Sequence, residues 1–322
     1  MALLEKRNYF KPFQYQWAYD AWFKQKNAEW LHTEITTMGD DVKAWKETLT
    51  EPEKNVIGNI LKGFTQTEVE VNEYWSTYVS KWFPVPEIRM MCSAFASIET
   101  VHAVAYSYLN DTLGLDDFQA FLEDEATMNK LKVLMDIDPN DTSVRNIARS
   151  LALFSACAEG IQLYSSFAVL LSFRLKNLMI GTGQQMMWSV RDESLHSEMG
   201  CKLFRTLIEE NPSIWTESFK TELYEGVDLA IKNEFHYIDK IFEMGDLEKI
   251  NKAALKNFMY DRANRKLKEL MLDPVYTVDK ELLEEMSWFY PMTSGEQQTD
   301  FFSNRETGYS QPNEDWNDEL FF

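Results

Sequence analysis

Residues 150–173 read SLALFSACAEGIQLYSSFAVLLSF, and this stretch carries a single charged side chain, Glu159. An ionised carboxylate inside an apolar helix is strongly unfavourable unless it is paired, hydrogen-bonded, protonated or bound to a metal. The stretch is long enough to cross a membrane, but its Glu, its Gln and its five Ser residues favour a helix buried within protein. We therefore expect a core helix in which another group compensates Glu159.

Two further apolar stretches follow the same pattern. Residues 90–110, MMCSAFASIETVHAVAYSYLN, carry one acid, Glu99, three residues before His102. Residues 178–196, LMIGTGQQMMWSVRDESLH, are uncharged until Arg191 and then place Glu193 three residues before His196. Residues three apart share a helix face, so each Glu-x-x-His unit can aim a carboxylate and an imidazole at one point. Two such units among only four His residues indicate metal ligation.

The composition favours long helices and excludes several classes of partner. The 322 residues include only 12 Gly and 9 Pro, and strand-like alternation is missing. A net charge of −20 disfavours binding to nucleic acid or to an anionic membrane. The three Cys residues have no CxxC spacing and the N-terminus lacks a signal-peptide pattern. We therefore expect an all-α, cytoplasmic protein with reduced thiols that binds neither nucleic acid nor membrane.

Caps and helix breakers place the expected helices. A capping-box signature at Thr50 and Glu53 starts a long helix, which a Pro-x-Pro pair ends. Asp141 or Thr142 is expected to cap the helix that carries Glu159. The expected helices cover residues 51–81, 87–109, about 142–176, the segment around residues 193–196, 217–244, 247–270 and 279–288, with shorter helices and turns over 116–136.

Two more acids would complete a metal site. One is Glu159, and the helix over 51–81 offers Glu68, Glu70 and Glu73, among which periodicity alone does not choose. Four helices would then supply four carboxylates and two imidazoles, enough for two divalent ions that share bridging carboxylates. This is the ligand pattern of ferritin-like di-iron and di-manganese bundles. The alternative for each acid is a buried salt bridge, but the apolar stretches supply no obvious Lys or Arg. We predict a ferritin-like helical bundle with a dinuclear metal site in its core.

Two neighbours of these ligands are candidates for other roles. Tyr106 lies four residues after His102 on the same helix face, where a phenol can donate a hydrogen bond, fill the core or act as a redox partner. Helix phase alone favours the core. Asp192 precedes Glu193 and could accept the free ring N–H of a ligating His, or it could be an ordinary surface acid.

These motifs resemble a known family, the small, radical-generating subunit of class I ribonucleotide reductase, over essentially the whole chain. The resemblance is carried by SIETVHAVAY (97–106), ACAEGIQLYSSFA (156–168), VRDESLH (190–196), LKGFTQTE (61–68) and EWLHTE (29–34). It selects Glu68 over Glu70 and Glu73. The metal ligands that it implies are Glu68, Glu99, His102, Glu159, Glu193 and His196.

The resemblance implies a reaction divided between two subunits. In the family, the reduced di-metal site reacts with an oxygen species and becomes a one-electron oxidant. That oxidant, or a radical on the residue matching Tyr106, removes an electron from a large subunit that reduces ribonucleotides to deoxyribonucleotides. Trp30, His102 and Asp192 match the inner part of the electron relay, and Tyr309 matches its outer tyrosine. The implied enzyme is ribonucleoside-diphosphate reductase, active only with the large subunit, and the implied assembly of this chain is a homodimer.

The last thirty residues differ in composition from the rest. They lack helical periodicity, yet they contain the aromatic residues Phe301, Phe302, Tyr309, Trp316, Phe321 and Phe322. We expect a ferritin-like domain over residues 1–292 and a flexible tail over 293–322. The end of the tail, NEDWNDELFF, resembles the peptide by which the family docks on the large subunit. The alternative is a tail packed on its own domain.

Three positions depart from the usual pattern of the family. The first ligand is Glu68 where many members have Asp, Leu163 stands where many have Phe, and Ser189 replaces an aliphatic residue. A phenoxyl radical survives best in a dry apolar pocket, so Ser189 argues against a stored radical on Tyr106. A Glu first ligand resembles subclasses that use manganese. We expect two metal ions per chain, manganese rather than iron or a mixed pair, activated by oxygen or superoxide with a flavoprotein as an optional helper.

Two other functions fit the same four-helix frame. A stand-alone di-metal oxidase or hydroxylase would need a substrate pocket beside the metals and would have no use for Trp30, Asp192, Tyr309 or an aromatic tail. A ferritin-like storage protein would take up far more than two ions per chain.

Overall fold

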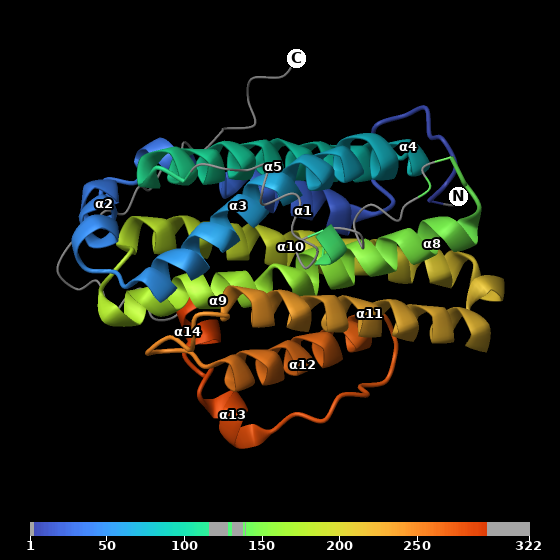
Figure 1. The fold of residues 1–322 in the computed structure, drawn as a ribbon. Helices are drawn as coiled ribbons and strands as arrows, with labels where there is room; N and C mark the ends of the chain where they lie inside the picture. The colour runs from blue at the N-terminus through green and yellow to red at the C-terminus, as the bar shows by residue number, and fades with distance from the viewer. Residues whose placement is uncertain (1–2, 116–127, 131–137, 139, 295–322) are drawn as a thin grey trace, which may run out of the picture.

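The structure is a computed structural model that describes residues 3–115, 128–130, 138 and 140–294, without the side chains of residues 69 and 70. The long helices lie side by side as a bundle (Figure 1). Within the described residues there is no named strand, and a single isolated bridge pairs Leu247 with Ile250. The predicted all-α architecture is confirmed.

One side of the bundle is built from the N-terminal helices α1 (Gln16–Asn27), α3 (Glu51–Glu73) and α5 (Pro86–Leu113). Half of the predicted capping box is present: the Thr50 backbone N–H donates to Glu53 Oε2 at 2.8 Å, and the Thr50 hydroxyl donates to the same oxygen at 2.9 Å. From α3 the chain continues through the π-helix η2 (Tyr74–Val79) into α4 (Ser80–Trp82). Helix α5 runs four residues beyond the predicted end and stops where Gly114 adopts φ 67°.

The apolar stretch around Glu159 lies in a continuous buried helix in three parts. These are α8 (Val144–Leu153), the π-helix η3 (Phe154–Gln162) and α9 (Tyr164–Ser172). Ser143 caps it, accepting the Asn146 backbone N–H at 3.3 Å, so the predicted caps were wrong. Asp141 instead accepts the Ser143 N–H at 2.9 Å and forms the turn before the helix.

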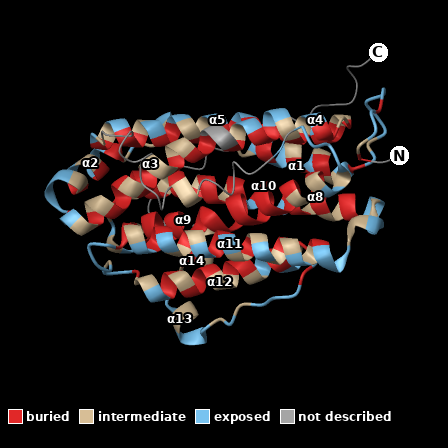
Figure 2. Ribbon diagram, turned by 45° about the vertical axis from the view of Figure 1, so that its right-hand side comes forward, coloured by how far each residue is buried: buried red, intermediate tan, exposed pale blue. Residues whose placement is uncertain are grey.

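This helix is also the one segment of the described chain that could cross a membrane by length and composition. The candidate span is Val144–Lys176, and its most apolar window is wholly buried inside the protein. Figure 2 shows the buried residues on the facing sides of neighbouring helices, with exposed residues on the outer rims. The helix therefore serves as the core around which the others pack.

Helix α10 (Ile180–Glu210) packs against η3 and carries the second Glu-x-x-His unit. Its start is fixed by Asp41 of α2 (Met38–Glu47), which accepts the backbone N–H groups of Gly181 at 3.1 Å and Thr182 at 2.6 Å. A carboxylate there satisfies orphan donors and complements the positive end of the helix. Gly181 and Gly183 lie within the helix and do not stop it.

The C-terminal helices complete the bundle, and the first two of them contact η3. They are α11 (Glu217–Ile241), α12 (Lys252–Glu269), α13 (Lys280–Glu284) and α14 (Phe289–Thr293). The helix predicted from residue 247 starts later, because residues 247–250 form a bridged turn and Asn251 caps α12. The helix predicted over 279–288 ends early, at Glu284. Helices α1 and α2 were not predicted, and most of residues 116–136 and the tail from residue 295 lie outside the described residues.

Candidate metal centre

Six buried side chains from four helical segments meet in the core of the bundle. They form two groups, and within each group the candidate ligand atoms lie within 4.8 Å of one another. The first group is Glu68 from α3, Glu99 and His102 from α5, and Glu193 from α10. The second is Glu99, Glu159 from η3, Glu193 and His196. Glu99 and Glu193 belong to both groups.

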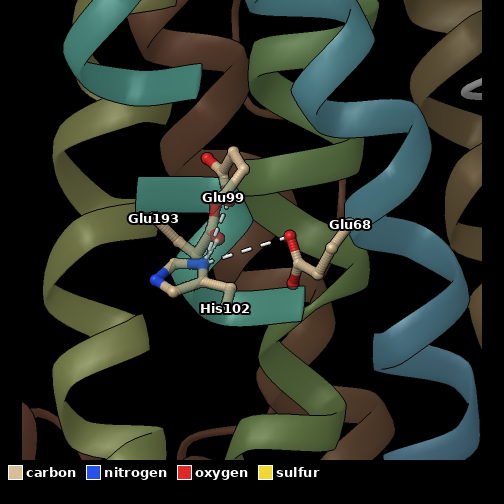
Figure 3. A group of neighbouring side chains, drawn as sticks. All are labelled: Glu68, Glu99, His102 and Glu193. Carbon is tan, nitrogen blue, oxygen red and sulfur yellow. Dashed lines mark ion pairs between the residues drawn. The ribbon is translucent and has the colours of Figure 1, made fainter. Parts of the chain in front are cut away.

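In the first group three carboxylates face one imidazole nitrogen (Figure 3). His102 Nδ1 lies 3.0 Å from Glu99 Oε2, 3.2 Å from Glu193 Oε1 and 4.0 Å from Glu68 Oε2. The other ring nitrogen of His102 points away from these carboxylates. Nδ1 is therefore the atom that His102 offers to a shared ion.

The second group repeats this arrangement around His196. Its Nδ1 lies 2.6 Å from Glu99 Oε1, 3.8 Å from Glu193 Oε2 and 3.9 Å from Glu159 Oε1. Each shared carboxylate thus turns one oxygen toward His102 and the other toward His196. That is the geometry of a carboxylate that bridges two metal ions.

The hydrogen-bond status of these atoms fits a metal site. Among the described residues no hydrogen bond reaches Nδ1 of either His, Oε2 of Glu68 and Glu159, or any carboxylate oxygen of Glu99 and Glu193. Buried polar atoms are nearly always hydrogen-bonded, so a cluster of orphaned acceptors needs another partner. Carboxylate oxygens and imidazole nitrogens are ligands that manganese and iron accept. The donor set therefore fits two divalent ions.

The electrostatics of the cluster point the same way. Burial raises the pKa of Glu68, Glu159 and Glu193, and the negative charge of Glu99 raises each of them further. Burial also opposes ionisation of Glu99, but the two imidazoles hold the pKa of Glu99 below its usual range. Without cations, the four carboxylates would repel one another in a site that excludes water. Two divalent ions would remove that cost.

Asp192 and Gln25 lie next to the imidazole nitrogens that face away from the carboxylates. Asp192 Oδ2 lies 3.2 Å from His102 Nε2 and accepts the Trp30 indole N–H at 2.8 Å. Gln25 of α1 donates its amide N–H to Asp192 Oδ1 at 3.2 Å, and its Oε1 lies 3.2 Å from His196 Nε2. Trp30 is buried, and its ring lies 5.7 Å from that of His102 between centroids. One hydrogen-bonded network thus joins Trp30 to both halves of the site.

Tyr106 lies beside the first group. Its ring is 5.9 Å from that of His102 and stacks on Phe64 at 5.0 Å between centroids. It is fully buried, its hydroxyl makes no hydrogen bond among the described residues, and burial raises its pKa well above the usual value. Leu163 and Ser189 are buried too, and the Ser189 hydroxyl also makes no hydrogen bond there.

The remaining candidates lie either outside the cluster or outside the described part of the chain. Glu73 is exposed on α3, and the side chain of Glu70 is outside the described part. Tyr309 lies beyond the described residues. The structure therefore brings together the six expected ligands with Trp30, Tyr106 and Asp192, and it leaves the place of Tyr309 untested.

Comparison with known proteins shows which family this sequence matches. The sequence pattern of the family described as "Ribonucleotide reductase, small chain" matches residues 7–282. The chain belongs to this family.

The sequences of its relatives match this small chain over almost its whole length. It is 33% identical to a probable ribonucleoside-diphosphate reductase small subunit of Invertebrate iridescent virus 3, over 96% of this chain and 86% of the viral protein. It is 28% identical to the ribonucleoside-diphosphate reductase subunit beta of Chlamydia pneumoniae, over 94% of this chain and 90% of the relative.

Solved structures share the fold of the small chain at lower identity. The ribonucleotide reductase R2 subunit from Clostridium botulinum matches with a TM-score of 0.79 and 21% identity, over 87% of this chain and 89% of that one. The dimanganese(II)-NrdF of Streptococcus sanguinis matches with a TM-score of 0.75 and 20% identity, over 88% of this chain and 100% of that one. The predicted ferritin-like bundle is confirmed.

Two residues beside the ligands of this small chain were missed by sequence reasoning. Trp75 donates its indole N–H to Glu159 Oε1 at 2.7 Å. It lies seven residues after Glu68, on nearly the same face of the helix, so helix phase could have singled it out. No sequence signal pointed to Gln25, because the helix that carries it was not predicted.

Proposed function

We propose that this chain is the metal-binding, radical-generating small subunit of a ribonucleoside-diphosphate reductase, active only with a large subunit that binds the nucleotide. The observation that carries the proposal is the pair of shared carboxylates, Glu99 and Glu193, each with one oxygen toward each imidazole. Family membership and the names of the relatives support it.

The proposed metal ligands are the six residues of the two groups, Glu68, Glu99, His102, Glu159, Glu193 and His196. Two ions held there would supply a one-electron oxidant. We favour manganese over iron or a mixed pair, because Glu68 as the first ligand resembles the subclasses of the family that use manganese. The chain itself excludes water, since all six side chains are buried, and it orients both imidazoles through Asp192 and Gln25.

The residues proposed to carry an electron from the large subunit to the site are Trp30, Asp192, His102 and Tyr309. The first three form a continuous contact, because Asp192 hydrogen-bonds Trp30 and lies beside His102 Nε2. Tyr106, buried against His102, is the residue that would hold a stored radical. The hydroxyl of Ser189 makes its surroundings less apolar, which favours the metal pair as the stored oxidant.

The proposed partners follow from the family. Residues 293–322 would dock on the large subunit, and the domain over residues 1–292 would form a homodimer. Oxygen or superoxide would activate the site, with a flavoprotein as an optional helper, and the complex would work in the cytoplasm.

The first test is a metal titration of the full-length, metal-free chain with Mn²⁺ and, separately, with Fe²⁺. We expect two equivalents per chain, and we expect Glu68→Ala to bind one of them more weakly while Glu73→Ala, an exposed acid on the same helix, changes neither. Activated chain mixed with the large subunit should then reduce a ribonucleoside diphosphate.

Other results would contradict the proposal. Uptake far above two ions per chain would support metal storage. Oxidation of a small organic substrate without the large subunit, and no nucleotide reduction with it, would support a stand-alone oxidase.

A further inference from the structure

A buried arginine on α12 holds the backbone next to the metal ligand Glu159. Arg262 is 7% exposed, and its Nε and Nη2 both donate to the carbonyl oxygen of Gly160, at 3.2 and 2.7 Å. Its guanidinium carbon also lies 3.4 Å from the ring centroid of Tyr164. Charge-assisted, forked hydrogen bonds of this kind fix the direction of their acceptor strongly.

The charge of Arg262 makes this contact unusual. Two other cations of α12 pair with acids, Arg265 with Asp261 at 2.7 Å and Lys266 with Glu269 at 2.9 Å. Among the described residues no carboxylate pairs with Arg262. A buried cation without a counter-ion costs stability that an apolar side chain of equal length would not. The groups that compensate this charge are the Gly160 carbonyl, which accepts two hydrogen bonds, and the ring of Tyr164.

The backbone that Arg262 holds is a π-helix, in which wide turns replace the usual α-helical ones. Such turns are rare and are frequently found at functional sites. Ser197 of α10 donates to the carbonyl of Ser155 at 2.5 Å, four residues before Glu159. Arg262 holds the carbonyl one residue after it. Side chains from two other helices thus brace the turn on both sides of the ligand.

Gly160 allows this bracing because α10 and α12 approach it closely. A Cβ at this position would lie 2.7 Å from Ser197 Oγ and 2.8 Å from the side-chain carbons Cδ and Cε of Lys266. Tyr164, under the Arg262 guanidinium, exchanges a hydrogen bond of 2.7 Å with Ser194, the residue after the ligand Glu193. Arg262 therefore contacts residues next to the ligand Glu159 and, through Tyr164, next to the ligand Glu193, but it contacts neither ligand itself.

We propose that Arg262 is a positioning residue of the metal site: its forked hydrogen bond to Gly160 keeps η3 in the turn that aims Glu159 at the ion shared with His196. The inference rests on the proposed metal centre. It predicts an unequal effect, because only the group containing Glu159 and His196 depends on η3, whereas the group containing Glu68 and His102 does not.

The test is a Mn²⁺ titration of the metal-free full chain, in which the electron paramagnetic resonance signal of unbound Mn²⁺ counts free metal. In Arg262→Met one of the two equivalents should bind about tenfold more weakly, the size expected when a residue supporting a metal ligand is lost. The other equivalent should keep its affinity within about twofold. Arg262→Lys, which keeps the cation but loses the fork, should weaken the same equivalent by a smaller factor. Arg265→Met, three residues along the same helix at an exposed position, is the matched control and should change neither equivalent.

Four results would overturn the inference. The first is that the wild-type chain binds two ions and Arg262→Met binds both with unchanged affinity. The second is an equal weakening of both equivalents, which marks a general structural role. If Arg262→Met does not fold, Arg262→Lys decides alone, and unchanged affinities overturn the inference. A wild-type chain that binds fewer than two ions would overturn the proposed metal centre itself, and the inference with it.

Discussion

Each histidine of the centre is hydrogen-bonded on the side away from the carboxylates. His102 Nε2 faces Asp192 Oδ2, and His196 Nε2 faces Gln25 Oε1, both at 3.2 Å. An acceptor at Nε2 favours the tautomer that carries its proton there, which leaves the lone pair of Nδ1 free for a metal. The acceptors therefore decide which ring nitrogen is a ligand.

This assignment can be tested by removing one acceptor. Asp192→Ala leaves the Nε2–H of His102 without its partner, and we expect Mn²⁺ affinity to fall by about 10- to 100-fold. Trp30→Phe removes the indole N–H that donates to the same carboxylate oxygen but leaves Asp192 and His102 in contact. It should change the affinity by less than about threefold, since it orients no ligand directly. Titration of both variants with Mn²⁺ checks the prediction, and equal losses in the two would contradict it.

At the scale of elements, the site depends on the close approach of α10 to η3. Gly200 of α10 lies against Ser155 of η3, and a Cβ at Gly200 would lie 1.9 Å from Ser155 Oγ and 2.6 Å from Ser155 Cβ. The Ser155 hydroxyl can rotate away, but Ser155 Cβ cannot move aside without shifting the backbone of η3. The glycine therefore sets the distance between the two elements that carry Glu159 and Glu193.

Gly200→Ala should push the two elements apart. We expect the free energy of unfolding to fall by about 1–3 kcal/mol, the usual cost of overpacking a core. Gly39 of α2 is the matched control, because nothing lies within 4 Å of a Cβ built there. Gly39→Ala should be neutral or stabilise the fold by up to about 1 kcal/mol. Urea unfolding followed by circular dichroism measures both, and similar effects in the two variants would refute the packing argument.

The elements that the sequence predicted best are those in which an acidic residue interrupts an apolar stretch. The lone acids Glu99 and Glu159 stand out in apolar stretches, so the ligand-bearing helices could be found and placed on a common site. The sequence did not reveal the π-helical turns, because a wide turn has no pattern of its own and is held by tertiary contacts such as that of Arg262. Gln25 was missed for a similar reason, since its role depends on where α1 packs.

At the scale of the whole molecule, the N-terminal segment ties distant helices together. Arg7 donates to both carboxylate oxygens of Glu87 at the start of α5, with Nη1 3.0 Å from Oε1. Glu87 Oε1 also accepts the backbone N–H groups of Gln14 at 2.8 Å and Tyr15 at 3.0 Å. The Tyr15 hydroxyl donates to Glu210, the last residue of α10. One buried carboxylate thus fixes the segment that leads into α1, the helix that carries Gln25.

The Glu87 pair should make stability depend on pH. Burial raises the pKa of Glu87, but Arg7 and the backbone N–H groups outweigh it and hold the pKa below its usual value. A carboxyl whose pKa is lower in the folded state stabilises the fold above its unfolded-state pKa of about 4.3, and that contribution is lost as pH falls through the folded-state pKa. Glu87→Gln should therefore lower the free energy of unfolding by about 3 kcal/mol at pH 7. The difference from wild type should be as large at about pH 6 and clearly smaller at about pH 3.5. Urea unfolding at the three pH values, with the exposed Glu73→Gln as control, measures this, and a difference that stays constant to the lowest pH would show that the charge of Glu87 does not hold the segment.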